Sequence, residues 1–492
     1  MSRTDSFLVG TWNVAAINNN PFEYWVTYPD DEYKNFMLAI ENFLSDADED
    51  VPVREIFTEE MFCELHEAMK NQGIGLLHEL KECWVNDYSK RKAISGFLRD
   101  SKIGEKRLTS MPDRITNTIN LADGRKLKRP SVINTYMDCP LDSIKTWWHE
   151  WKHFMFSTRV LIFSRECAAP EPQLVFSLLG PIPRNKYPAI SIEEQRISMQ
   201  LQLLCLAILD AIFMHIVNRV APIRWESIRR TLSRALIDDK DDRLCQILAD
   251  SYLDRHVLFL QEASAALVQR ARAHPALSQR FAVLLPDDFD PRREQNSVIL
   301  VDRSRFDTAA AEDVTQLILA HASGDFLAPG DLFAASVRDS AGRLWLLVSF
   351  HGDSAGLSTA PTLRAVHRVR GALPGHVLLA GLDANTQSHG GDPRRQGVTA
   401  FRALLAALGA VSVWDAVADP FVQTTCGART CLQTQLAKAV GYHCRFSAAS
   451  VSLKDWILGY AAQVRQLSVP KQARFMSKLA IWSHSKQAVI GG

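Results

Sequence analysis

Short apolar runs that each end on a polar residue constrain this chain most, because they indicate strands of one sheet system that lie far apart in sequence. The first run, Phe7–Val14, is typical of a buried strand and carries Asn13 near its end. Three similar runs follow after residue 255 and end on Glu262, His351 and Asp383. A sheet that gathers such ends at one edge forms an oxygen-rich site that suits Mg²⁺.

Two further polar residues extend this series. Asn385 lies two positions beyond Asp383, so in an extended segment both side chains point the same way. Asp455 stands directly before the apolar run Trp456-Ile-Leu. His351 is followed by Gly352, which allows a close approach of the backbone, and a strand-end imidazole can donate a hydrogen bond to a phosphoryl oxygen. Each feature alone is common in turns and on surfaces, and their order makes them candidates.

The ordered series resembles the endonuclease/exonuclease/phosphatase superfamily, the deoxyribonuclease-like fold. The matching pattern is Trp-Asn at 12–13, Gln-Glu at 261–262, a strand ending in His351, Asp-x-Asn at 383–385, and Asp455 before an apolar strand. The resemblance implies an α/β fold with two packed sheets. It also implies a phosphoric-ester hydrolase that depends on Mg²⁺, with Mn²⁺ as a substitute.

The resemblance also implies roles for the matching residues. Asn13 and Glu262 would hold the metal ion, and Asp383 would activate or orient the attacking water. Asn385 and His351 would contact the phosphate, and Asp455 would orient a C-terminal histidine.

The C-terminal segment departs from the family pattern, which has Ser-Asp-His at this place. Here Lys486 and Gln487 follow Ser485. Side chains alternate between the two faces of a strand, so His484 would point to the face opposite to that of the family's histidine. We therefore expect impaired catalysis, and a non-catalytic binding or scaffold protein on the same fold stays open as an alternative.

The catalytic-type pattern is split, because the Gln-Glu strand comes more than two hundred residues after the Trp-Asn strand. We predict a sandwich domain made of residues 6–25 and 250–492, interrupted by a mainly helical insertion over residues 26–249. Apolar residues at three- and four-residue spacings predict helices in the insertion. These expected helices cover residues 33–44, 55–72, 76–84, 141–156, 190–217 and 225–236. The insertion is either a cover that props the sheet or a subdomain that selects a substrate or partner.

The segment Ile197–Val217 is apolar and about long enough to cross a bilayer. It also carries Gln200, Gln202, Asp210 and His215, and polar groups of this kind are costly in lipid. We therefore expect a buried core helix and no transmembrane segment.

Charge and cysteine content narrow the function classes. The chain of 492 residues has 56 Lys and Arg against 55 Asp and Glu, so it lacks the basic excess of proteins that grip long nucleic acids. The small basic cluster Arg125–Arg129 is expected to be a solvated turn. A nucleic acid, a nucleotide, an inositol phosphate or a phospholipid head group all remain possible substrates.

Nine cysteines without a framework of short spacings, and no secretory signal, favour an intracellular, cytoplasmic location.

A rival motif lies in the insertion. His149-Glu150-Trp-Lys-His153 fits the H-E-x-x-H pattern of zinc metallopeptidases, in which both histidines share a helix face and the glutamate acts as base. Glu166 or Glu171 would have to supply a third ligand. The tryptophans around the motif look like packing residues, so this reading ranks below the phosphoesterase.

Overall fold

The structure is a computed structural model that describes residues 7–16, 18–25, 30–122, 125–134, 141–162, 172–290, 293–322, 327–387, 394–416, 424–426, 430–434 and 451–460. The chain forms two compact units. The sandwich unit comprises Met1–Ile17, Asp238–Gly427 and Cys444–Gly492, and the helical unit comprises Asn18–Ile237 and Ala428–His443. The first segment of the helical unit spans 18–237, whereas the sequence predicts an insertion over 26–249. It ends earlier than expected because α10 (Lys240–Tyr252) packs with α11 (Ala265–Ala273) in the sandwich unit. No feature of the sequence indicates the second segment of the helical unit.

Two sheets form the sandwich unit, which confirms the α/β sandwich fold. The smaller sheet has the order β1 (Val9–Asn13), β6 (Val257–Ala263), β8 (Asn296–Asp302) and β7 (Phe281–Leu284). The larger sheet has the order β13 (Ala410–Ser412), β16 (Asp455–Tyr460), β12 (His376–Asp383), β11 (Leu344–His351), β10 (Leu332–Asp339) and β9 (Phe306–Asp313). A separate two-stranded ribbon joins β14 (Thr425–Cys426) to β15 (Val451–Ser452).

The core between the sheets consists of inward-facing residues from both, such as Phe259 and Ile299 against Leu347 and Leu379. The sheets approach each other closely at Gly381, where an added Cβ would lie 2.3 Å from a ring carbon of Phe259. Only glycine fits this position, and it lies two residues before Asp383. The close approach therefore brings the end of β12 toward the end of β6.

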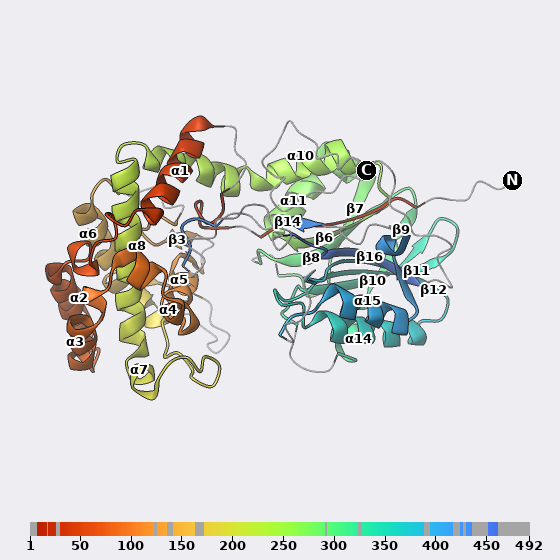
Figure 1. The fold of residues 1–492 in the computed structure, drawn as a ribbon. Helices are drawn as coiled ribbons and strands as arrows, with labels where there is room; N and C mark the ends of the chain where they lie inside the picture. The colour runs from red at the N-terminus through yellow and green to blue at the C-terminus, as the bar shows by residue number, and fades with distance from the viewer. Residues whose placement is uncertain are drawn as a thin grey trace. The chain divides into compact units, whose positions relative to one another are not determined.

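Helices cover the outer faces of the sandwich unit. Figure 1 shows α10 and α11 on one side of the sheets and α14 (Thr359–Ala372) and α15 (Val398–Ala407) on the other. The latter pair packs on the outer face of the larger sheet, where Val366 and Phe401 join Val348 and Leu382 in a second core. The remaining helices of this unit are α12 (Pro275–Arg280) and α13 (Thr315–Leu319).

The helical unit has a helix in each range that the spacing of apolar residues predicts, with shifted ends and with the range 190–217 divided into two helices. Two short helices at 101–105 and 110–116 were not predicted. The helices of the unit are α1 (Asp31–Ser45), α2 (Glu59–Asn71), α3 (Leu77–Asn86), α4 (Ser101–Glu105), α5 (Ser110–Thr116), α6 (Ile144–Phe156), α7 (Ile192–Arg196), α8 (Ser198–Val220) and α9 (Trp225–Ser233). Its strand pairs are β2 (Thr118–Asn120) with β3 (Lys126–Lys128), and β4 (Arg159–Val160) with β5 (Gln173–Leu174). Short 3₁₀ or π segments of the chain are η1 (Val53–Glu55), η2 (Tyr88–Lys90), η3 (Ala93–Leu98), η4 (Val175–Leu178), η5 (Arg234–Asp238) and η6 (Val413–Ala416).

Local capping explains where several of these helices begin. The side chain of Asp30 accepts hydrogen bonds from the first turn of α1, and Thr58 does the same for α2. Ser191 and Glu194 form a capping box at the start of α7.

Helix α8 is the centre of the helical unit, with α1, α5 and α6 packed around it (Figure 1). By length and composition it could cross a membrane, but 94% of its apolar window is buried inside the structure. This burial agrees with the expected core helix.

Asp210 explains how a polar residue is accommodated within α8. Its carboxylate accepts hydrogen bonds from Arg129 Nε at 2.8 Å, Trp151 Nε1 at 3.0 Å and Ser131 Oγ at 2.7 Å. The expectation of a solvated turn at Arg129 is therefore wrong, since this guanidinium is fully buried and paired.

Candidate active site

The polar residues that the sequence places at strand ends meet at one edge of the two sheets. Strands β1 and β6 run parallel and pair Asn13 with Gln261. Strands β11 and β12 also run parallel and pair His351 with Asp383. Because parallel strands end at the same edge, the fold brings together residues that the sequence analysis expected to converge.

Glu262 reaches the site through an irregularity in β6. The register of β6 with β8 shifts between Leu260 and Ala263, and Glu262 has a φ of 55°. Residues other than glycine rarely adopt this left-handed conformation, which costs about 1–3 kcal/mol. A bulge of this kind redirects a side chain. Here it places the Glu262 carboxylate beside the end of β1, where Oε2 accepts the N–H of Ala16 at 2.7 Å.

Asn13 links the two carboxylates of the site. Its Nδ2 donates to Glu262 Oε1 at 2.7 Å and to Asp383 Oδ2 at 2.8 Å. Its Oδ1 accepts the N–H of Ala15 at 2.9 Å, which fixes the orientation of the amide. Two negative charges this close repel each other, and the shared N–H donor between the carboxylates offsets part of this repulsion.

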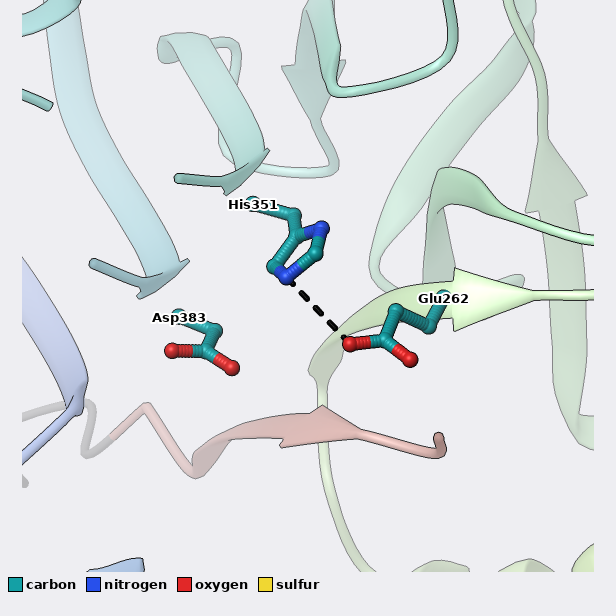
Figure 2. A group of neighbouring side chains, drawn as sticks. All are labelled: Glu262, His351 and Asp383. Atoms are coloured by element: carbon teal, nitrogen blue, oxygen red, sulfur yellow. Dashed lines mark ion pairs between the residues drawn. The ribbon is translucent and has the colours of Figure 1, made fainter. Parts of the chain in front are cut away.

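Glu262, His351 and Asp383 form a group that could hold a metal ion (Figure 2). One ligand atom from each residue lies within 4.8 Å of the others, and His351 Nε2 is 3.2 Å from Glu262 Oε1. Within the part of the chain that the structure describes, these three residues are the set of His, Cys, Asp and Glu side chains close enough to share a metal ion. Two carboxylates that leave room for waters suit Mg²⁺, and a nearby imidazole is also compatible with Mn²⁺. The donor set therefore fits the expected cation.

Asn385 lies in the same site, held in a strained conformation. It is 4% exposed and has a φ of 50°. Its backbone N–H donates to Asp383 Oδ1 at 3.1 Å, and its Nδ2 donates to the carbonyl of Gly352 at 2.8 Å. The same Nδ2 lies 3.4 Å from His351 Nε2. The amide of Asn385 is thus fixed beside the imidazole.

Lys454 is a site residue to which the sequence analysis gave no role. Its Nζ donates to Asn385 Oδ1 at 2.9 Å, so a cation stands next to the amide. The available signal was its position directly before Asp455, a residue that the family pattern had already marked.

Asp455 lies opposite Asp383 in the antiparallel pairing of β16 with β12. Its N–H donates to Thr424 Oγ1 at 2.9 Å, and its Oδ2 accepts the hydroxyl of Thr425 at 3.3 Å. These contacts place Asp455 at the same sheet edge. Its expected histidine partner and the C-terminal residues Lys486, Gln487 and His484 lie outside the described residues.

Gln261 supports the site from the space between the sheets. It is fully buried, and its Nε2 lies 3.2 Å from Thr11 Oγ1, from Ser349 Oγ and from the carbonyl of Gly381. These contacts fix β6 against β1, β11 and β12 at the point where the site residues begin.

Lys240 adds a second cation near Glu262. It is 5% exposed at the start of α10, and its Nζ donates to the carbonyl of Ala15. Burial lowers the pKa of this ammonium, although the carboxylates of Asp241, Glu262 and Glu294 oppose the shift. The sequence hides this role, because acidic residues on both sides of Lys240 are typical of an exposed segment.

The histidines of the rival zinc motif do not face a site of this kind. His149 and His153 are both exposed on α6, while Trp147 and Trp151 of the same helix are buried. The metal-capable group among the described residues does not include either histidine. Glu166 and Glu171 lie outside the described residues. The tryptophans therefore pack as expected, and the zinc hypothesis gains no support.

Comparison with protein families gives one match, within the helical unit. A family model described as a domain of unknown function, DUF8234, matches residues 50–230, which is less than half of the chain. A comparison with curated proteins gives no match.

Solved structures similar to this chain include TDP2 from D. rerio complexed with single strand DNA product. Its sequence is 18% identical to this one, and the match has a TM-score of 0.31 and covers 46% of this chain and 77% of that chain. An endonuclease/exonuclease/phosphatase from Bacteroides vulgatus is 14% identical, with a TM-score of 0.31 over 45% of this chain and 78% of that chain. The mannosyl-6-phosphatase Bt3783 of Bacteroides thetaiotaomicron is 12% identical, with a TM-score of 0.30 over 45% and 76%. One of the three bears the name of the superfamily that the sequence pattern resembles.

Proposed function

We propose that the sandwich unit hydrolyses a phosphoric ester in a reaction that depends on Mg²⁺, with Mn²⁺ as a substitute. The observation that carries this proposal is the group of Glu262, His351 and Asp383, whose ligand atoms lie within 4.8 Å of one another at a sheet edge. A cation bound there would polarise the phosphoryl oxygens and neutralise the leaving group.

The roles follow from the chemistry of each side chain. Glu262 offers carboxylate oxygens to the cation, and Asp383 orients the attacking water or accepts its proton. His351 and the amide of Asn385 are hydrogen-bond donors on the same side of the site, where they would stabilise charge on the phosphoryl oxygens. Asp455 would hold the acid or base that the C-terminal segment supplies.

In this proposal Asn13 positions the carboxylates of Glu262 and Asp383, which bind the cation. Its amide nitrogen faces both carboxylates, so it holds them at the separation that a shared cation needs. Only a half-turn of the amide would bring its oxygen toward the cation, and this turn would break the contact with the N–H of Ala15.

The substrate is a phosphate ester whose remaining part the site does not define. A nucleic acid, a nucleotide, an inositol phosphate and a phospholipid head group all carry the required phosphate. The net charge of +1 favours a small substrate over a long nucleic acid. We place this activity in the cytoplasm, on the grounds of cysteine usage.

The C-terminal residues set the expected rate. A positioned acid or base contributes typically 10²–10⁴-fold to such a reaction. Lys486 and Gln487 replace the Asp-His pair of the family pattern, so we expect weak turnover. The double replacement of Lys486→Asp with Gln487→His should raise the rate. If His484→Ala abolishes a fully active wild type, His484 is the missing base and the tail is aligned differently.

The test of the proposal is a substrate panel of phosphomonoesters and phosphodiesters with Mg²⁺, Mn²⁺ or EDTA. We expect activity that EDTA removes and that Glu262→Gln and Asp383→Asn each abolish. Glu312→Gln is the matched control, because Glu312 is an exposed carboxylate on β9. Metal-independent turnover, or turnover that survives both site variants, would contradict the proposal.

A non-catalytic binding protein on the same fold is the second candidate, favoured by the replacement at 486–487. Binding of Mg²⁺ and of phosphate without turnover on any panel substrate would establish it in place of the hydrolase.

A further inference from the structure

We propose that Lys454 is a positioning residue that orients Asn385 and with it forms an anion-binding corner for a phosphoryl group. The inference deepens the proposed function and rests on it for the identity of the anion. Lys454 is half-buried and lies directly before β16, and its Nζ donates to Asn385 Oδ1 at 2.9 Å.

The lysine determines which way the amide of Asn385 faces. An ammonium group only donates hydrogen bonds, so it must face the amide oxygen and not the amide nitrogen. The nitrogen then faces the carbonyl of Gly352 at 2.8 Å and the imidazole of His351 at 3.4 Å. Lys454 therefore presents an N–H donor of Asn385 to the side of the site where His351 lies.

Both partners of this contact are held by the backbone. The N–H of Asn385 is bound to Asp383, and the N–H of Ala384 donates to the carbonyl of Lys454 at 2.9 Å. The N–H of Lys454 donates to Thr424 Oγ1 at 3.0 Å. The pair is thus built into the junction of β12 and β16, and the amide needs little reorganisation when a ligand arrives.

The positive charge of Lys454 indicates that the ligand bound beside Asn385 is an anion. Glu262 and Asp383 make the other side of the site negative, which suits a cation. The ammonium of Lys454 brings a positive charge to the Asn385 side, which suits an anion. Hydrogen bonds that involve a charged partner are roughly twice as strong as neutral ones. A phosphoryl group that contacts Asn385 lies beside this positive charge, and it can also bridge to a cation at the carboxylates.

The experiment measures binding of inorganic phosphate to the full-length chain by titration calorimetry, with Mg²⁺ and with EDTA. Lys454→Met should weaken phosphate binding by about tenfold, the loss of one charge-assisted hydrogen bond. Lys454→Arg should retain most of the affinity, because it restores the charge and the donors. Combining Lys454→Met with Asn385→Ala should weaken binding by less than the two single effects together, since the lysine acts in part through the amide.

A matched control separates a specific role from a general loss of positive charge or fold. Lys106 is a lysine of the helical unit with a 21% exposed side chain, ion-paired with Glu194. Lys106→Met should leave phosphate binding unchanged, and melting curves of all variants report on folding. The proposal is wrong if Lys454→Met binds phosphate like the wild type, if Lys454→Arg is as weak as Lys454→Met, or if the wild type binds no phosphate.

Turnover distinguishes this inference from the proposed function. If no panel substrate is hydrolysed but phosphate binding still depends on Lys454, the hydrolase proposal fails and the anion-binding corner stands. If turnover is found, Lys454→Met should lower kcat and raise KM, and Lys454→Arg should recover part of both.

Discussion

Asn13 and Asp383 lie 370 positions apart in the sequence, yet Nδ2 of Asn13 is 2.8 Å from Oδ2 of Asp383. Both side chains are buried, with exposures of 2% and 0%. The hydrogen bond joins β1 of the smaller sheet to β12 of the larger one. It therefore ties the two sheets together at the edge where the candidate site lies.

Replacing Asn13 by alanine should expose the cost of two neighbouring carboxylates. Asn13→Ala removes the N–H donor that lies between the carboxylates of Asp383 and Glu262. The free energy of unfolding should therefore fall by about 1–3 kcal/mol. Mg²⁺ should restore more stability to Asn13→Ala than to the wild type, because the cation neutralises the repulsion. Urea denaturation with and without MgCl₂ measures both effects. An equal Mg²⁺ effect in the two proteins would contradict this account.

The carboxylates should also couple cation binding to thermal stability. A ligand that binds only the folded state stabilises it by about 2.7 kcal/mol at one hundred times its Kd. MgCl₂ should therefore raise the Tm of the wild type, while Glu262→Gln and Asp383→Asn should lose this increase. Glu312→Gln should keep it. A Tm increase that persists in both site variants would place the cation elsewhere.

The strand ends were the predictable part of this site. Asn13, Glu262, His351 and Asp383 each close an apolar run, and parallel pairing brings such ends to one edge whatever the intervening length. The contact of Lys454 with Asn385 was not predictable, because it depends on the register of β16 against β12. Strand β9 was also missed, since its sequence Phe-Asp-Thr-Ala-Ala-Ala-Glu-Asp lacks the apolar alternation of a buried strand.

Arg129 shows a different limit of sequence interpretation. A cluster of basic residues near a turn is usually solvated, and nothing in the local sequence shows a carboxylate 81 positions away. The polar residues of α8 did predict a core helix, but not which residue would neutralise Asp210.

Breaking this buried pair should destabilise the helical unit strongly. Arg129→Met leaves the Asp210 carboxylate in the core without its cation, which costs about 3–5 kcal/mol. Glu67→Gln is a suitable control, because it breaks an exposed pair with Lys70 and should cost less than about 1 kcal/mol. Chemical denaturation monitored by tryptophan fluorescence measures both. Similar losses in the two variants would mean that Arg129 contributes little.

Lys240 should make stability depend on pH in the alkaline range. Burial lowers its pKa in the folded state, so between that pKa and its ordinary value the unfolded chain binds more protons than the folded one. Wild-type stability should therefore rise with pH through this interval, relative to Lys240→Met. Unfolding free energies of both proteins at several alkaline pH values give the difference. A constant difference would show that the pKa of Lys240 is unshifted.

Gly381 should tolerate no side chain. A Cβ at this position would lie 2.3–2.5 Å from carbon atoms of Phe259, so Gly381→Ala must push the sheets apart. Overpacking of this kind costs about 1–3 kcal/mol. The separation should also weaken the Mg²⁺-dependent increase in Tm, because β12 carries Asp383. Adding Phe259→Leu should recover part of the loss. Wild-type behaviour of Gly381→Ala would contradict the close approach.

The left-handed backbone at Glu262 and Asn385 means that this site opposes the stability of the fold that carries it. A glycine at either position would relax the backbone, and a chain selected only for stability would gain from such a change. The side chains present there are instead a carboxylate and an amide, through which we propose that the site binds its ligands. Stabilising this protein by design should therefore begin away from positions 262 and 385, since relief of strain there would remove the groups that make this sheet edge chemically distinctive.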